Sequence, residues 1–269
     1  MTTIKIYFLF VICLVSFSCL AQVVNPAGVT TETRFPVPEG FTRIIVPNNS
    51  FASYLRTFPL KPHGSVVKYY NGNEKRNRVY DAVFDIDVGA KDLQQCADAI
   101  IRLRAEYLYK EKKYNDITFN FTNGFAVAYS RWITGERIKV EGNKSWWVKT
   151  SQPANNYEVF KKYLETVFIY AGTLSLSKSL KSVDFMNMQI GDVLIQGGSP
   201  GHAVIVIDMA ENTKGEKLYM LAQSYMPAQD IHVLKNNTNP GLSPWYTLKQ
   251  SNNINTPEWT FKITDLKRF

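Results

Sequence analysis

Residues 189–209 read QIGDVLIQGGSPGHAVIVIDM, and the rest of the predicted fold is arranged around this stretch. Its two apolar, β-branched runs predict a short strand at Val193–Gln196 and a longer, buried strand at Ala203–Met209, joined by a Gly- and Pro-rich turn. His202 lies at the mouth of the second strand, directly after Gly201. A histidine beside a glycine that allows close approach is well placed for acid–base chemistry. The alternative is a structural histidine bonded to a backbone carbonyl.

Length and composition limit the classes of protein to consider. The chain has 269 residues, of which 45% are hydrophobic, enough to bury a core as one large domain. Its net charge is +8, but the Lys and Arg residues are scattered, so no nucleic-acid partner is predicted. A mildly basic surface suits an anionic polymer such as cell wall or polysaccharide. The spacing of Cys and His predicts no metal site, and no cofactor is expected.

The first 21 residues have the pattern of a signal peptide. Lys5 supplies the charged start, and residues 6–17 form an apolar run too short to span a membrane. Cys19-Leu20-Ala21 is a small-x-small cleavage site, which predicts a mature chain beginning at Gln22 and no later integral membrane segment. The chain is therefore expected to be exported, to the periplasm or outside the cell. The alternative is a lipid anchor at Cys19.

Export leaves one cysteine in the mature chain. Cys13 and Cys19 leave with the signal peptide, so only Cys96 remains and no internal disulfide can form. Cys96 lies in a predicted helix, residues 93–112, whose apolar stripe is Leu93, Cys96, Ile100, Leu103 and Tyr107. On another face, Asp98–Arg102 and Arg102–Glu106 have the spacing of ion pairs. Cys96 is then either a small buried hydrophobe or a thiol whose pKa the helix N-terminus lowers.

The remaining pattern predicts one α+β domain over residues 22–269. Residues 218–224 are expected to be a strand next to the one that His202 begins. Between about 113 and 187 we expect a mainly helical insertion, with an amphipathic helix at 156–170 and a Trp-bearing hairpin at 134–151.

Three residues suggest cysteine nucleophile chemistry. Such chemistry needs a thiol near a helix start, a histidine to hold its proton and a polar group to orient the histidine. Cys96, His202 and Gln223 fit these roles, because Gln223 lies on the predicted neighbouring strand. His232 and Asp208 are alternatives for the third role. A glycosidase with two carboxylates stays open in principle, although no particular pair stands out.

A resemblance accompanies these residues. Gly191-Asp192-Val193-Leu194 followed by Gly201-His202-Ala203-Val204-Ile205-Val206 resembles the paired strands of papain-like cell-wall peptidases and amidases of the NlpC and CHAP types. It implies a papain-like core, in which a central helix packs on an antiparallel sheet, with Cys96 as nucleophile, His202 as base and Gln223 as orienting residue. The chain also resembles a family of secreted bacterial proteins of unknown function, through DLQQCADA, FTNGF and LAQSYMPAQ.

The resemblance makes an exported cysteine hydrolase the leading expectation, one that cleaves amide bonds in the peptides of peptidoglycan. Candidate substrate-binding residues are Gln95, Gly201, Ser224 and Trp245, and either Gln94 or Gln95 is the candidate oxyanion donor. One alternative is an inactive papain-like protein that binds cell wall or peptide. Another is a protein that binds glycans by stacking aromatic side chains on sugars, for which the candidates are Trp146, Trp147, Trp245 and Tyr246.

Overall fold

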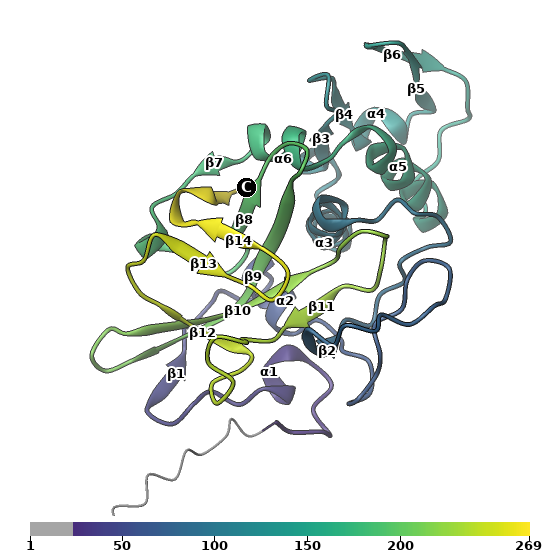
Figure 1. The fold of residues 1–269 in the computed structure, drawn as a ribbon. Coiled ribbons are helices and arrows are strands. Elements are labelled where there is room, and N and C mark those ends of the chain that lie inside the picture. The colour runs from purple at the N-terminus through teal and green to yellow at the C-terminus, as the bar shows by residue number, and fades with distance from the viewer. Residues whose placement is uncertain (1–23) are drawn as a thin grey trace, which may run out of the picture.

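A large antiparallel sheet organises the protein (Figure 1). The computed structural model describes residues 24–269. Within them, nine strands form this sheet in the order β2-β11-β10-β9-β8-β15-β7, with β1 also paired to β9 and β12 to β10. The strands are β1 (Phe41–Arg43), β2 (Tyr80–Val83), β7 (Lys181–Ser182), β8 (Val193–Gln196), β9 (His202–Asn212), β10 (Lys217–Gln223), β11 (His232–Leu234), β12 (Trp245–Leu248) and β15 (Leu266–Arg268).

Strand β9 is the centre of the sheet. Its residues 202–210 are all buried, because it is paired on both edges and covered on both faces. The predicted strands at 193–196 and 203–209 are therefore confirmed, the second being longer than expected. Gln196 of β8 pairs with His202 of β9 next to the turn between the two strands. The histidine is therefore the first residue of the central strand.

Helices and small hairpins surround the sheet. The helices are α1 (Thr31–Arg34), α2 (Phe51–Arg56), α3 (Cys96–Lys110), α4 (Tyr129–Trp132), α5 (Tyr157–Tyr170) and α6 (Thr173–Ser179), with 3-10 turns at Tyr114–Asp116, Phe185–Asn187 and Ile263–Asp265. Three hairpins stand apart from the main sheet: β3 (Thr118–Asn120) with β4 (Ala126–Ala128), β5 (Glu136–Glu141) with β6 (Lys144–Lys149), and β13 (Asn253–Asn255) with β14 (Thr260–Lys262). This is a mixed α+β fold, as the sequence predicts.

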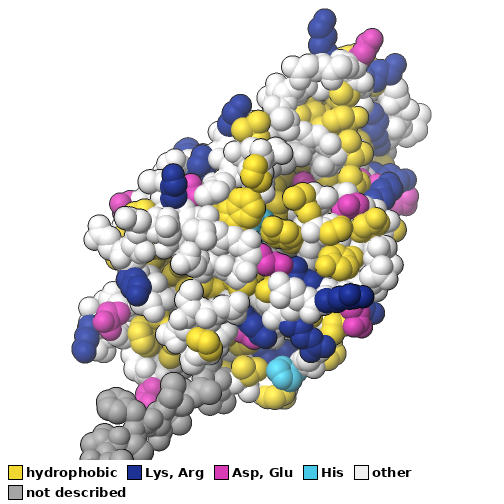
Figure 2. Space-filling model, in the orientation of Figure 1, with side chains coloured by type: hydrophobic (Ala, Val, Ile, Leu, Met, Phe, Trp, Pro, Cys, Tyr) yellow, Lys and Arg dark blue, Asp and Glu magenta, His cyan; other side chains and the backbone are white. Residues whose placement is uncertain are grey.

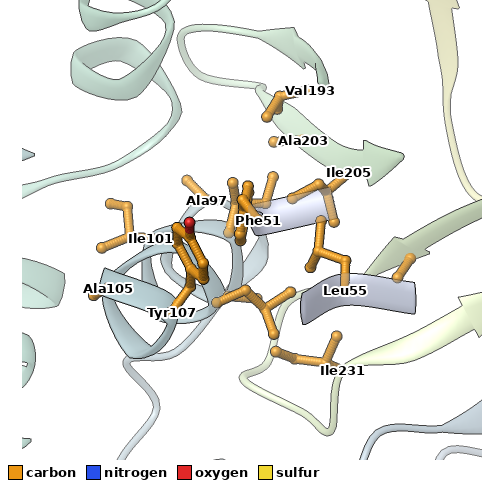
Figure 3. Packing of buried hydrophobic residues seen from close by; sticks show 14 of the residues in the cluster. Phe51, Leu55, Ala97, Ile101, Ala105, Tyr107, Val193, Ala203, Ile205 and Ile231 are labelled. Atoms are coloured by element: carbon orange, nitrogen blue, oxygen red, sulfur yellow. The ribbon is translucent and has the colours of Figure 1, made fainter. Parts of the chain in front are cut away.

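The two faces of the sheet bury different sets of side chains. On one face, Ala203 and Ile205 of β9 pack with Val193 of β8 against Ala97 and Ile101 of α3 (Figure 3). The alternate residues of β9 belong to a second cluster, which includes Phe261 of the β13–β14 hairpin. Since side chains alternate along a strand, His202 leaves the sheet on this second face. Helix α3 is thus the central helix packed on the sheet.

Two expectations about the helices need correction. Residues 113–187 are only partly helical, because two of the hairpins lie within them, together with α4, α5, α6 and β7. Arg102 pairs with Glu106 at 2.7 Å as predicted, but not with Asp98. Arg102 is only 1% exposed and lies among Asp87, Gln94 and Tyr157, so this face of α3 is buried under neighbouring segments instead of lying in solvent.

The predicted signal peptide, residues 1–21, and the alternative anchor at Cys19 lie outside the described residues. In the part of the chain that the structure describes, none of the helices has the length and apolar character needed to cross a membrane.

Candidate active site

Cys96 is the first residue of α3 and faces the start of β9. The helix begins there because Asp98 in its first turn accepts a hydrogen bond from the Gln95 backbone N–H at 3.2 Å. The backbone N–H groups of Ala97, Ala203 and Cys96 itself act on the Cys96 thiol and favour its charged form. Ala203 directly follows His202, so the helix start lies against the backbone at the strand start, while the His202 side chain leaves the sheet on the face opposite α3.

The net effect on the thiol is opposite to the one that the helix N-terminus alone predicts. Burial, followed by the nearby Asp98 carboxylate, raises the pKa of Cys96 to about 11. The expected lowering of this pKa is therefore wrong, because desolvation of the thiolate outweighs the three backbone N–H groups. The resting side chain is a protonated thiol at neutral pH.

His202 is held by Gln223, the partner that the sequence predicts. The imidazole Nε2 lies 2.8 Å from Gln223 Oε1, and both side chains are 1% exposed. Because an amide oxygen only accepts, Nε2 donates and the lone pair of the neutral ring is on Nδ1. Burial lowers the pKa of His202 to about 4, so the imidazole is neutral at neutral pH.

Behind Gln223 lies a chain of buried polar groups. Its Nε2 donates to Glu258 Oε2 at 2.6 Å and lies 3.3 Å from His232 Nε2. Glu258 Oε1 in turn pairs with Lys75 Nζ at 2.7 Å. His232 is thus a partner of Gln223 and not of His202.

Aromatic rings enclose the imidazole. The ring centroids of Tyr225, Trp259 and Phe261 lie 4.8, 5.4 and 5.9 Å from that of His202. Burial raises the pKa of Tyr225, and the charges of Glu258 and Cys96 add to this effect. Tyr225 therefore adjoins both the imidazole and the surroundings of the thiol. Such enclosure excludes water from the hydrogen bond between His202 and Gln223.

A cleft of about 380 Å³ gives access to Cys96. Its walls come from the start of α3, the end of α5, the turn before β9 and Met226; Gln95, Cys96, Asp98 and Gly201 are among the lining residues. Ile169, Leu174 and Met226 are large apolar side chains left exposed near or in this cleft. Hydrophobic side chains also gather across the middle and upper part of the face in Figure 2. The cysteine thus borders a cleft whose walls mix apolar side chains, such as Phe168 and Met226, with the Asp92 and Asp98 carboxylates, and none of the described residues that line it is Lys or Arg.

Two of the predicted substrate-binding residues are in the cleft wall. Gly201 approaches Thr173 so closely that a Cβ would lie 2.4 Å from its Oγ1. Gln95 lines the cleft, with its Nε2 donating to Asp92 Oδ1 at 3.0 Å. Its neighbour Gln94 is buried, and its Nε2 has no hydrogen-bond partner among the described residues.

The other proposed binding residues are structural. Ser224 is fully buried and donates to the Gln229 carbonyl at 2.8 Å. Trp245 is 0% exposed and lies in the core, so neither residue can contact a ligand in the cleft. Residue type alone does not determine whether a loop or strand turns a side chain inward.

The structure also bears on Asp208 as an orienting residue and on the aromatic candidates for sugar stacking. Asp208 is 0% exposed and bound by Arg43 at 2.7 Å and Arg56 at 2.6 Å, which leaves it no role beside His202. Of the aromatic candidates for sugar stacking, Tyr246 is 4% exposed, whereas Trp146 is 38% exposed. Among residues 24–269, His, Cys, Asp and Glu form no group of three that could hold a metal ion.

Sequence reasoning missed Lys75, Tyr225, Glu258 and Trp259. Glu258 and Trp259 lie in the turn of the β13–β14 hairpin, and Lys75 in a loop before β2. No periodicity or spacing marks these positions, because only the packing of the hairpin against the sheet brings them to His202.

Comparisons with known proteins give a family and no activity. No curated protein and no solved structure matches the chain. Residues 31–268 match the family model described as Domain of unknown function (4846). This match spans nearly all of the described residues, so the chain belongs to the Domain of unknown function (4846) family.

Proposed function

We propose that the protein is an exported cysteine hydrolase with a papain-like core that cleaves amide bonds, and that its substrates are the peptides of peptidoglycan. One observation carries the proposal. His202, on the central strand, donates Nε2–H to a buried amide oxygen at 2.8 Å, next to a helix that presents Cys96 to a cleft. A neutral imidazole with a free Nδ1 lone pair is the base that a protonated thiol needs.

The resting site is a neutral pair and not a thiolate–imidazolium pair. The pKa of the thiol is raised to about 11 and that of the imidazole is lowered to about 4, so the proton stays on sulfur until substrate binds. In the first step, His202 Nδ1 takes the thiol proton as Cys96 Sγ bonds to the substrate carbonyl carbon. Gln223 Oε1 then stabilises the imidazolium through its hydrogen bond to Nε2–H.

The start of α3 supplies donors for the developing oxyanion. The backbone N–H groups of Cys96 and Ala97 lie beside the sulfur at a helix N-terminus, where positive potential favours an anion. Collapse of the tetrahedral intermediate breaks the C–N bond, and the imidazolium returns its proton to the leaving amine. Water, deprotonated by Nδ1, then hydrolyses the thioester and restores the thiol.

The test is release of peptide fragments from purified sacculi and from a panel of synthetic cell-wall peptides, measured by chromatography and mass spectrometry. We expect the wild type to release fragments, and Cys96→Ala and His202→Gln each to lower the rate at least about 10³-fold. His63→Gln is the matched control, since this histidine is exposed and outside the site. Equal release by Cys96→Ala would refute the proposal.

A second candidate function is binding without cleavage, and the raised pKa of Cys96 is the observation that favours it. An inactive relative would keep the cleft and its affinity for cell wall or peptide. It predicts that the wild type sediments with sacculi, that Cys96→Ala sediments equally well, and that neither releases fragments. Cysteine-dependent fragment release would exclude it.

A further inference from the structure

The network behind His202 contains a residue pair to which the proposed mechanism gives no role. Glu258 reaches Gln223 from the β13–β14 hairpin, and Lys75 reaches Glu258 from a loop nearly two hundred residues earlier in the chain. Both side chains are largely withdrawn from solvent, at 13% exposure for Glu258 and 4% for Lys75. A buried ion pair that contacts the orienting residue of a candidate triad calls for a specific role.

The direction of each hydrogen bond follows from chemistry. His232 Nδ1 lies 2.8 Å from the Asp230 carbonyl oxygen, which only accepts, so Nδ1 carries the hydrogen. His232 Nε2 is then an acceptor toward Gln223. The Glu258 carboxylate also accepts on both oxygens, from Lys75 and from Gln223. Two acceptors therefore face the same end of the Gln223 side chain, and that end must be the NH₂ group.

This arrangement determines which nitrogen of His202 carries the hydrogen. With its NH₂ directed at Glu258 and His232, Gln223 can offer His202 only an oxygen. We propose that Glu258, held by Lys75, is a positioning residue that fixes the orientation of the Gln223 amide and thereby keeps His202 in the Nε2–H tautomer. The basic nitrogen is then Nδ1, the one to which the proposed function assigns the transfer of the thiol proton.

The substitution Glu258→Gln gives a sharp prediction. The new amide has one oxygen for two donors, and the charged, buried Lys75 ammonium takes it. The NH₂ group of the new side chain then faces the NH₂ group of Gln223. Rotation of the Gln223 amide relieves this clash and turns its NH₂ toward His202 Nε2, and it gives up only the longer contact with His232 Nε2, at 3.3 Å. The imidazole must now accept there, so its hydrogen moves to Nδ1.

The tautomer can be measured directly by long-range ¹H–¹⁵N NMR on protein labelled at histidine nitrogens, with His202→Gln assigning the signals. We expect Nε2–H in the wild type and Nδ1–H in Glu258→Gln. The double variant Lys75→Met/Glu258→Gln frees the amide oxygen for Gln223 and is expected to restore Nε2–H. A wild type with Nδ1–H, or a Glu258→Gln variant that keeps Nε2–H, would overturn the proposal.

A second variant covers the case in which Glu258→Gln does not fold. Lys75→Met/Glu258→Leu removes the closer of the two acceptors without leaving a buried charge unpaired. Only the 3.3 Å contact with His232 Nε2 then holds the Gln223 NH₂ group, so we expect a substantial population of Nδ1–H. His202 held entirely as Nε2–H in this variant would also refute the positioning role. Thr238→Val, in a loop away from the site, is a control that should leave the tautomer unchanged.

Only the catalytic consequence of this inference rests on the proposed function. If the protein cleaves peptides, Glu258→Gln should lower kcat about 10³- to 10⁴-fold with little change in KM, as a wrong tautomer does. If NMR shows tautomer control but the wild type releases no fragments, the proposed function fails and the positioning role stands. If the wild type releases fragments but NMR shows no tautomer control, the proposed function stands and the positioning role fails.

Discussion

Cys96 and Asp98 illustrate how position and environment act on a single residue in opposite directions. The helix start and the adjacent N–H groups favour a thiolate, whereas burial and the Asp98 carboxylate favour the thiol. Asp98 is itself buried, with Oδ1 lacking a hydrogen-bond partner within residues 24–269, and burial raises the pKa of its carboxyl well above the usual value. The Cys96 thiol is thus kept protonated first by burial and second by the Asp98 carboxylate.

Asp98→Asn should therefore lower the pKa of Cys96. The amide oxygen can still accept from the Gln95 N–H, so the helix start is retained while the charge is lost. The expected result is several-fold faster iodoacetamide labelling near pH 8, with the midpoint of the rate–pH curve moved to lower pH. Labelling followed by mass spectrometry measures this rate.

The control is Asp116→Asn, which removes a carboxylate from an exposed position beyond the other end of α3. An unchanged midpoint in Asp98→Asn would show that its charge does not govern the thiol.

His202 of the candidate site lies at the start of β9. The turn before this strand is tightly packed around Gly201. A Cβ on Gly201 would lie 2.4 Å from Thr173 Oγ1 and 2.5 Å from the Gly198 carbonyl oxygen. This glycine is what allows α6 and the turn to approach, and it fixes where His202 begins the strand.

Gly201→Ala is expected to lower the free energy of unfolding by roughly 1–3 kcal/mol, because the added methyl group must displace backbone atoms. Urea unfolding followed by tryptophan fluorescence measures the change. Gly172→Ala is the matched control, since a Cβ there meets open space. Equal, small effects of the two substitutions would contradict the packing argument.

The far part of the same strand is fixed by an ion cluster. Asp208 on β9 binds Arg43 of β1 and Arg56 of α2, so one carboxylate attaches both elements to the sheet. Asp208→Ala leaves two guanidinium groups unpaired and should cost about 3 kcal/mol or more of stability. Urea unfolding tests this, and fragment release per folded molecule should not change. If a stably folded Asp208→Ala variant lost activity, a purely structural role for Asp208 would be wrong.

At the scale of the whole molecule, two buried neutral histidines make stability depend on pH. Burial lowers the pKa of His202 to about 4 and that of His232 to about 3, from 6.5. The unfolded chain therefore binds more protons than the native protein below pH 6.5, and stability is lost as the pH falls from 6.5 toward 4.

The contribution of His202 to this loss is about 3 kcal/mol, since its pKa moves from 6.5 to about 4 and each pKa unit corresponds to about 1.4 kcal/mol. We expect His202→Gln to lose less stability than the wild type between pH 7 and pH 4, by urea unfolding at each pH. His63→Gln, at an exposed position, should follow the wild-type curve. Parallel curves for wild type and His202→Gln would refute this account.

Much of the fold and one contact of the candidate site could be predicted from the sequence. Alternating apolar residues around a Gly-Pro turn predict β8, β9 and the place of His202. A three- and four-residue spacing predicts α3 and puts Cys96 in its first turns, and antiparallel neighbours predict that Gln223 reaches His202. These features depend on local periodicity and on adjacent strands, which a sequence records directly.

The other features of the site depend on how distant segments pack together. Glu258 and Lys75 reach Gln223 from a hairpin turn and a distant loop, contacts that no local pattern encodes. Burial reverses the expected pKa of Cys96 and removes Ser224 and Trp245 from the cleft. Solvent exposure and long-range contacts depend on the positions of all the segments in the folded chain. Local patterns in the sequence therefore predict the elements and their order, whereas the protonation states and the partners of the site residues follow from packing.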